Sequence, residues 1–165
     1  MRTLRQLVPL AIVLGLFAVA TTVLLQRGMA VGVWMLAAFL LGHGLVHVMF
    51  AAPPPVTAGS PGADFAFDPG HSWLVTSGVL RTSAVRVIVL ILVAITIVGY
   101  AMAAAATAGL IVPASWWPAL VLGSTAASAT LMIVGLSPGL ALGIAIDVAL
   151  VWLVIVRAWS PALVG

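Results

Sequence analysis

Long apolar stretches alternate with short polar connections along this chain, and this pattern predicts membrane-spanning helices. The stretches are about 20 residues long, the length that an α-helix needs to cross the hydrocarbon core of a bilayer. We therefore predict an all-α polytopic integral membrane protein, a bundle of five transmembrane helices forming a single membrane domain over residues 1–165. The predicted spans cover about residues 7–25, 29–51, 84–111, 116–136 and 138–159.

Proline and glycine mark the connections. Pro53, Pro54 and Pro55 end the second stretch, because proline supplies no helical N–H and disfavours helix in the residue before it. They open the only long connection, residues 53–82, which we interpret as a tether rather than a lid. Within it, residues 71–80 predict a short helix on the membrane surface, with an aromatic side chain at headgroup level.

Composition narrows the class of protein. The chain is 64% hydrophobic and 5% charged, whereas soluble domains carry about 25% charged residues, so a water-soluble globule is excluded. The six basic residues lie near the ends of apolar stretches, where they reach lipid headgroups, so the positive charge does not indicate nucleic acid. The absence of lysine excludes a Schiff base to retinal, and the absence of cysteine excludes thiolate metal sites.

The arginines also predict an orientation in a bacterial-type inner (plasma) membrane. Arg2 and Arg5 precede the first stretch as in a signal peptide, but that stretch is longer than a signal sequence and predicts an uncleaved helix. With five spans, Arg2, Arg5, Arg81 and Arg86 lie on one side, against Arg27 and Arg157 on the other. The positive-inside rule then favours a cytoplasmic N-terminus.

Ionisable side chains at membrane depth are rare and mark sites or structural polar contacts. Here they are His43 and His47, four residues apart in the second span, and Asp147 in the fifth. Counting about 1.5 Å per residue from the same side of the membrane places His43 roughly 12 Å deep and Asp147 roughly 13 Å deep. Thr96, Tyr100 and Ser128 fall near that level and complete a predicted polar layer.

Three interpretations of this layer remain open. In the first, Asp147 and His43 only lock two helices together, as in a structural or accessory subunit of a membrane complex. In the second, His43, His47 and Asp147 bind one divalent transition metal, Zn²⁺ or Fe²⁺, because histidines at i and i+4 share a helical face. In the third, the histidines and the carboxylate relay protons.

The metal interpretation has consequences of its own. A metal-dependent intramembrane enzyme acting on a lipid-soluble substrate is a further option, so the sequence does not decide whether the protein is an enzyme. Haem is disfavoured, because two histidines on one helical face cannot take opposite axial positions on one iron. His71 is most simply a surface residue, and it becomes a third imidazole only if the long connection folds back over His47.

Three short motifs carry a resemblance. They are Leu-Gly-His-Gly-Leu-Val-His in the second span, Phe-Asp-Pro-Gly-His-Ser-Trp-Leu in the long connection and Ile-Asp-Val in the last span. In these the chain resembles small bacterial multi-span membrane proteins of uncharacterised function, which carry His-Gly-x-x-His in an early helix. The resemblance implies no activity. The expected partners are the bilayer and either further copies of the chain or a larger membrane complex.

Overall fold

The computed structural model describes residues 15–16, 19–21, 23–24, 27, 30–51, 68–135 and 141–161. These residues form helices and turns, with no strand among them, which confirms the all-α prediction. The α-helices of more than one turn are α2 (Ala30–Val46), α4 (Thr82–Thr107), α5 (Trp117–Gly135) and α6 (Ala141–Ile155). Shorter pieces are the 3₁₀-helices η1 (His47–Phe50), η3 (Pro69–His71) and η4 (Ala114–Trp116), and the four-residue helix α3 (Trp73–Thr76).

Three of the five predicted spans are present as helices long and apolar enough to cross a membrane. They cover Val31–Phe50, Thr82–Thr107 and Ala114–Gly135. The fifth prediction, 138–159, corresponds to α6, which at 15 residues is shorter than these three. Most of the first prediction, 7–25, lies outside the described residues. The structure thus supports a membrane-embedded helical protein without confirming five spans.

The third span ends at Thr107, four residues before the predicted end at Ile111. Gly109 has a φ of +66°, a conformation that costs glycine little. The N–H of Leu110 donates to the carbonyl of Ala105 and the N–H of Gly109 to that of Ala106. This is the Schellman pattern that closes a helix. A glycine two residues after a helical run was the signal for this boundary.

The predicted surface helix, residues 71–80, is shorter than expected and is docked on the bundle. After α3 ends at Thr76, Gly78 adopts a positive φ of +75°, as Gly109 does after α4. Ser72 Oγ donates to the carbonyl of Val134 at 2.8 Å, and Trp73 Nε1 donates to that of Ile133 at 2.9 Å. The described part of the long connection therefore caps the C-terminal end of α5 and is more than a tether. Residues 53–67 of that connection lie outside the described part.

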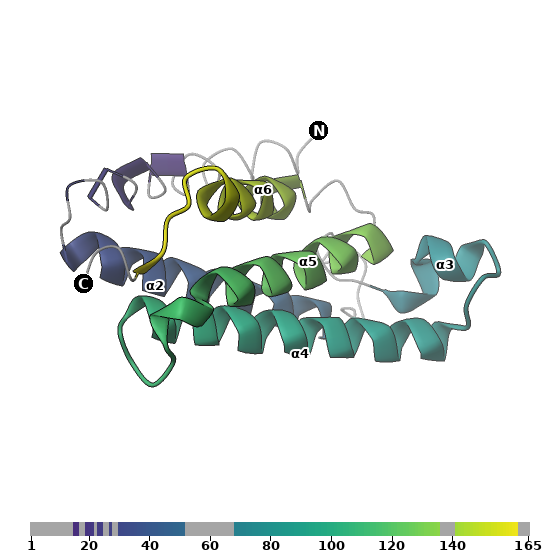
Figure 1. The fold of residues 1–165 in the computed structure, drawn as a ribbon. Coiled ribbons are helices and arrows are strands. Elements are labelled where there is room, and N and C mark those ends of the chain that lie inside the picture. Colours follow the sequence, from purple (N-terminus) through teal and green to yellow (C-terminus); the bar gives the residue numbers. More distant parts are fainter. Residues whose placement is uncertain are drawn as a thin grey trace.

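The long helices pack antiparallel to their neighbours. Figure 1 shows α5 between α4 and α6, with α2 running along α4. Small residues permit the close approaches: a Cβ on Gly44 of α2 would lie 3.0 Å from Cβ of Tyr100 in α4, and one on Gly99 of α4 would collide with Ser124 Oγ in α5. Helices in lipid associate through such close contacts, since lipid gives them no hydrophobic reason to do so.

Two apolar clusters and a polar layer between them follow the length of the bundle. Along α4, along α5, and along α2 with its continuation η1, buried polar residues lie between the two clusters. The Trp117 cluster comprises Leu36, Ala37, Leu40, Tyr100, Ala103, Ala104, Ala106, Val112, Trp117, Val121 and Leu150. The Val89 cluster comprises Val85, Val89, Val93, Leu131 and Val134, with Phe50, Leu74, Val75 and Leu80 packed on it. The structure thus contains a buried polar network, and apolar packing closes it on both sides.

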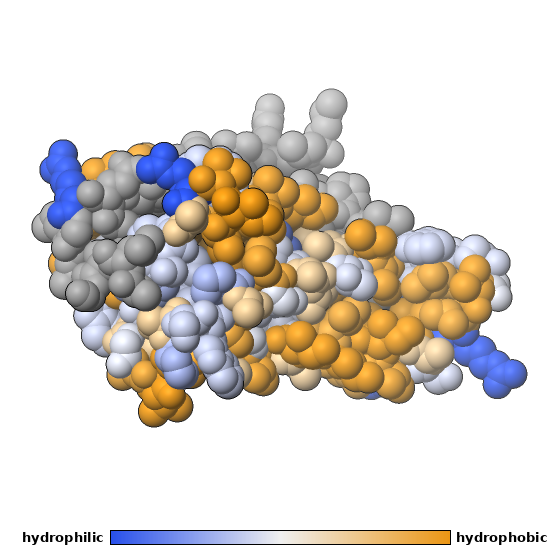
Figure 2. Space-filling model, viewed as in Figure 1, coloured by the Kyte–Doolittle hydropathy of each residue, from blue (hydrophilic) through white to orange (hydrophobic). Residues whose placement is uncertain are grey.

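The outer surface of the described bundle is largely apolar. Figure 2 shows hydrophobic residues along its side and strongly hydrophilic residues toward its two ends. On α4 the exposed side chains include Val87, Leu90, Ile91, Ile95 and Val98. Such a continuous apolar surface matches a lipid environment rather than water.

Candidate functional site

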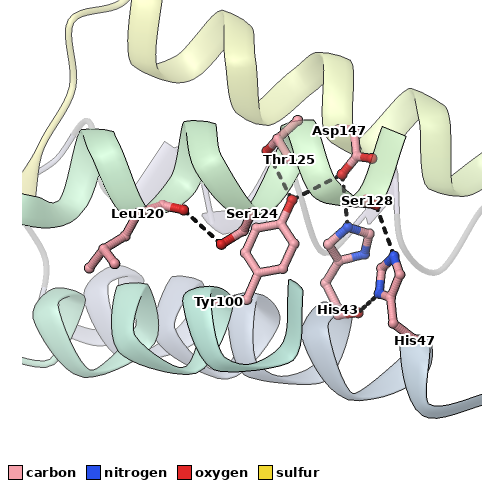
Figure 3. A network of polar contacts seen from close by, with 8 residues as sticks. All are labelled: His43, His47, Tyr100, Leu120, Ser124, Thr125, Ser128 and Asp147. Carbon is pink, nitrogen blue, oxygen red and sulfur yellow. Dashed lines mark hydrogen bonds and ion pairs between the residues drawn. The ribbon is translucent and has the colours of Figure 1, made fainter. Parts of the chain in front are cut away.

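The polar layer is centred on Asp147, which projects from α6 toward α2 and α4 (Figure 3). The residue is 3% exposed. Its Oδ1 atom lies 3.1 Å from Nε2 of His43 and accepts a hydrogen bond from the hydroxyl of Tyr100 at 3.0 Å. One carboxylate oxygen therefore joins three helices, and the predicted contact between the second and last apolar stretches is present.

Tyr100 continues the network into α5. Its hydroxyl lies 2.9 Å from Oγ1 of Thr125. Because Tyr100 donates its proton to the carboxylate, Thr125 is the donor in this second bond. The ring of Tyr100 stands edge to face against the ring of His43, with centroids 5.0 Å apart, and so restricts the position of His43. The hydroxyl of Tyr100 determines which group donates in each of its two hydrogen bonds.

His47 lies one turn further along the chain, where α2 tightens into the 3₁₀-helix η1. Its Nδ1 lies 2.9 Å from the carbonyl oxygen of His43, and its Nε2 lies 2.8 Å from Oγ of Ser128 in α5. A carbonyl oxygen only accepts, so Nδ1 carries a proton. In the neutral ring, Nε2 then accepts from the Ser128 hydroxyl, which fixes the tautomer.

Two buried oxygens in this layer have no hydrogen-bond partner among the described residues. They are Oδ2 of Asp147 and Oγ1 of Thr96. Thr96 thus lies in the predicted layer but makes no bond to the other site residues. The bare Oδ2 atom is the more consequential of the two, because an unpaired carboxylate oxygen away from water is costly.

The predicted metal ligands do not converge in this arrangement. His43 and Asp147 meet, but both ring nitrogens of His47 are engaged by the His43 carbonyl and Ser128. Within the part of the chain that the structure describes, no three histidine, aspartate or glutamate side chains are grouped so that they could hold a metal ion. Binding a metal at His43, His47 and Asp147 would require His47 to leave these partners.

His71 does not join the site. Its side chain is 86% exposed, and its Nδ1 lies 2.7 Å from Oδ2 of Asp68. The backbone N–H of Gly70 donates to Oδ1 of Asp68 at 2.8 Å, and this bond, with help from His71, holds the pKa of the Asp68 carboxyl below its usual range. These residues shape the turn that precedes α3.

Sequence reasoning missed Thr125, which bonds to Tyr100, and the docking role of Ser72. Thr125 lies three residues before Ser128 and hence on a similar side of α5. That spacing was the available signal. Ser72 offered none, because its partner is a backbone carbonyl at the end of a distant helix.

No family model matches the sequence, and no curated protein or solved structure was found to be similar to it.

Proposed function

We propose that this chain is a multi-pass protein of a bacterial-type inner membrane and that its His43–Asp147 pair binds and releases a proton within the bilayer. The first and last apolar stretches complete five spans in this proposal, and the N-terminus is cytoplasmic. The protein acts on its own, as a homo-oligomer or as a subunit of a larger membrane complex.

The observation that carries the proposal is the unequal environment of the two Asp147 oxygens. Oδ1 has two partners, whereas Oδ2 is buried and has none among the described residues. With Asp147 ionised and both histidines neutral, the layer holds one uncompensated negative charge, which a low-dielectric interior strongly disfavours. One proton, bound to Oδ2 or to the ring of His43, makes the pair neutral.

No arginine in the described bundle lies close enough to balance the negative charge of Asp147. The titratable groups that face Asp147 in the described bundle are His43 from α2, His47 from η1 and Tyr100 from α4. Helix α5 presents the hydroxyls of Thr125 and Ser128 (Figure 3). The described arginines lie near helix ends or in turns, away from this layer. Proton uptake, rather than a fixed cation, therefore balances the carboxylate.

Infrared and nitrogen NMR spectra test the proposal directly. The chain has no glutamate and three aspartates, so Asp64→Asn/Asp68→Asn leaves Asp147 as the one side-chain carboxyl. In this background we expect a signal that changes with pH, either the carbonyl stretch of a protonated carboxyl or the ¹⁵N shift of an imidazolium at His43. Asp147→Asn should abolish it. A wild-type pair whose spectra do not change between acid and alkaline pH refutes proton binding.

The structural alternative has its own support, because the same bonds join α2, α4, α5 and α6. It is separated from proton binding by comparing Asp147→Asn with Asp147→Leu in thermal unfolding. Asparagine keeps an acceptor for His43 and Tyr100, whereas leucine leaves both donors unpaired, at about 1–3 kcal/mol for each buried group. We expect Asp147→Leu to be much less stable and Asp147→Asn to stay near the wild type while losing the titration.

A metal ion at His43, His47 and Asp147 is tested by elemental analysis of protein purified without chelator. A structural site binds about one ion per chain with high affinity. Zn²⁺ or Fe²⁺ near one equivalent in the wild type, lost in His47→Ala, would replace the proton proposal with a metal site. Trace metal that is unchanged in His47→Ala would exclude it.

A further inference from the structure

Different residues separate the polar layer from water at the two ends of the bundle, and this difference indicates at which end a proton enters. At one end stands the Trp117 cluster. The indole of Trp117 is fully buried, its Nε1 donates to Oγ1 of Thr107 at 2.8 Å, and Thr107 in turn donates to the carbonyl of Ala103. The ring of Trp159 packs edge-on against it at 4.9 Å. The buried indole, its hydrogen bond to Thr107 and the packed ring of Trp159 close this end of the layer.

The opposite end is closed by short elements. His47 and Ser128 are the polar pair of the layer nearest to that end, and the Val89 cluster follows them along α4 and α5. Phe50 of η1 stacks on the His47 ring with centroids 5.9 Å apart. Beyond the cluster lies α3, at the end of the bundle in Figure 1.

Two side-chain hydrogen bonds fasten α3 to the bundle. Ser72 Oγ and Trp73 Nε1 donate to the carbonyls of Val134 and Ile133, which belong to the last turn of α5. Carbonyls in a last helical turn have no partner within their own helix. Water can replace both donors at a membrane surface, so undocking α3 leaves no buried group unpaired. Opening the other end would leave Trp117 Nε1 without its acceptor, Oγ1 of Thr107, in an apolar setting.

We infer that the His43–Asp147 site exchanges its proton with water at the α3 end, past His47 and Ser128, and that undocking of α3 admits this water while the Trp117 end stays closed. This inference rests on the proposed function. It makes the site a proton-binding site with one-sided access and not a continuous path across the bundle.

Single cysteines test the inference without background, because the natural chain has none. Val89→Cys and Val121→Cys form a matched pair, since both are helical valines with at most 1% exposure, one in each cluster. Each is made in the otherwise unchanged chain and in Ser72→Ala/Trp73→Phe, which removes both α3 donors. The proteins are placed in lipid nanodiscs, which expose both faces, and a charged methanethiosulfonate reagent is added. Modification is followed by mass spectrometry.

We expect Val89→Cys to react about tenfold faster once the two donors are removed, because two lost hydrogen bonds shift the undocked population by a factor of that order. Val121→Cys should react slowly and equally in both backgrounds. Equal rates for Val89→Cys in the two backgrounds, or acceleration of Val121→Cys alone, would overturn the inference.

Hydrogen exchange of the unaltered chain gives an independent measurement if the double variant does not fold. Amides of residues 72–76 should exchange at least about tenfold faster than those of residues 119–121, which follow the buried indole of Trp117 in α5. Comparable protection at the two ends would count against one-sided access.

If the spectra show that Asp147 titrates while Val89→Cys is unaffected, only the route is wrong. If Val89→Cys responds while no group titrates, proton binding fails, and the inference falls with it.

Discussion

At the scale of single residues, Gly99 determines how closely α4 and α5 can approach each other. It lies opposite Ser124 where α4 and α5 cross, and a Cβ there would collide with the serine Oγ atom. Ser124 is held in place by a 2.7 Å bond to the carbonyl of Leu120. This contact lies in the same layer as Tyr100 and Thr125. The distance between α4 and α5 therefore also determines the hydrogen bond between these two hydroxyls, beside Asp147.

Gly99→Ala should therefore destabilise the protein by about 1–3 kcal/mol, the usual cost of overpacking. The measurement is thermal unfolding in detergent. Gly123→Ala is the matched control, because it lies on the same pair of helices and its Cβ would meet no atom within 4 Å. Alanine's higher helix propensity should leave that variant neutral or slightly more stable.

The double variant Gly99→Ala/Ser124→Ala separates a steric cause from other causes. Removing the serine Oγ atom removes the collision, so the double variant should regain most of the stability lost in Gly99→Ala. A loss that persists in the double variant would show that the close approach of the two helices is not what Gly99 provides.

The sequence predicted how deep the site residues lie in the membrane, but not which neighbouring helix each side chain faces. The rise per residue of a helix is constant, so counting from the helix ends placed His43 level with Asp147, and the two are bonded. A membrane helix is apolar on all sides, so the pattern does not say which side faces a neighbour. For this reason Thr96 was chosen, although its hydroxyl has no hydrogen-bond partner among the described residues, and Thr125 was missed. His47 was predicted to face Asp147, but it bonds to Ser128.

At the scale of elements, α3 and the turn before it form a small unit that pH should perturb. Asp68 caps η3 through the N–H of Gly70 and bonds to His71. The pKa of Asp68 is lower in the folded protein than in an unfolded chain, chiefly because of the Gly70 bond. A carboxyl with a depressed pKa stabilises the fold above its unfolded pKa of about 3.9 and loses that contribution as pH falls through its folded value.

We therefore predict that residues 68–76 loosen in acid, below a pH of about 4. Trp73 is the natural reporter, because its indole N–H is bonded to the carbonyl of Ile133 and becomes solvated when the unit loosens. Its fluorescence should change at low pH when it is compared with Trp73→Phe as the subtraction control. In Asp68→Asn, which keeps a capping oxygen but cannot titrate, the change should be absent. An identical acid transition in Asp68→Asn would assign it to another group.

The boundaries of the helices were predicted to within a few residues where the length of the apolar stretch determines them. They were predicted less well where capping residues end the helix. The spans 84–111 and 116–136 correspond to α4 and α5, with the first shortened by Gly109. Pro118 lies in the first turn of α5, where its missing N–H costs nothing. The end of the last helix was predicted at Trp159, but α6 ends at Ile155. The chain then turns through Ala158, at φ 45°, and brings Trp159 onto Trp117.

At the scale of the whole molecule, the proposed orientation in the membrane depends on the arginines at the two ends of the bundle. Arg81 and Arg86 lie at the α3 end, at the start of α4, whereas Arg27 and Arg157 lie near the start of α2 and after the end of α6. The antiparallel packing of these helices puts the two pairs at opposite ends of the bundle (Figure 1). Since the pairs balance, the orientation rests on Arg2 and Arg5, which lie outside the described residues.

If those two arginines keep the N-terminus inside, the α3 end is cytoplasmic and the proton site exchanges with the cytoplasm. Ser77, after α3, and Ser115, in η4, are exposed residues at the two ends of the bundle, and each can be replaced by cysteine in a chain that has none. In intact cells an impermeant maleimide should label Ser115→Cys, and it should label Ser77→Cys only after the membrane is permeabilised. Arg2→Ala/Arg5→Ala leaves two arginines on each side, so both cysteines should then be labelled in part. Labelling of Ser77→Cys alone in intact cells would reverse the orientation and make the site exchange protons with the outside.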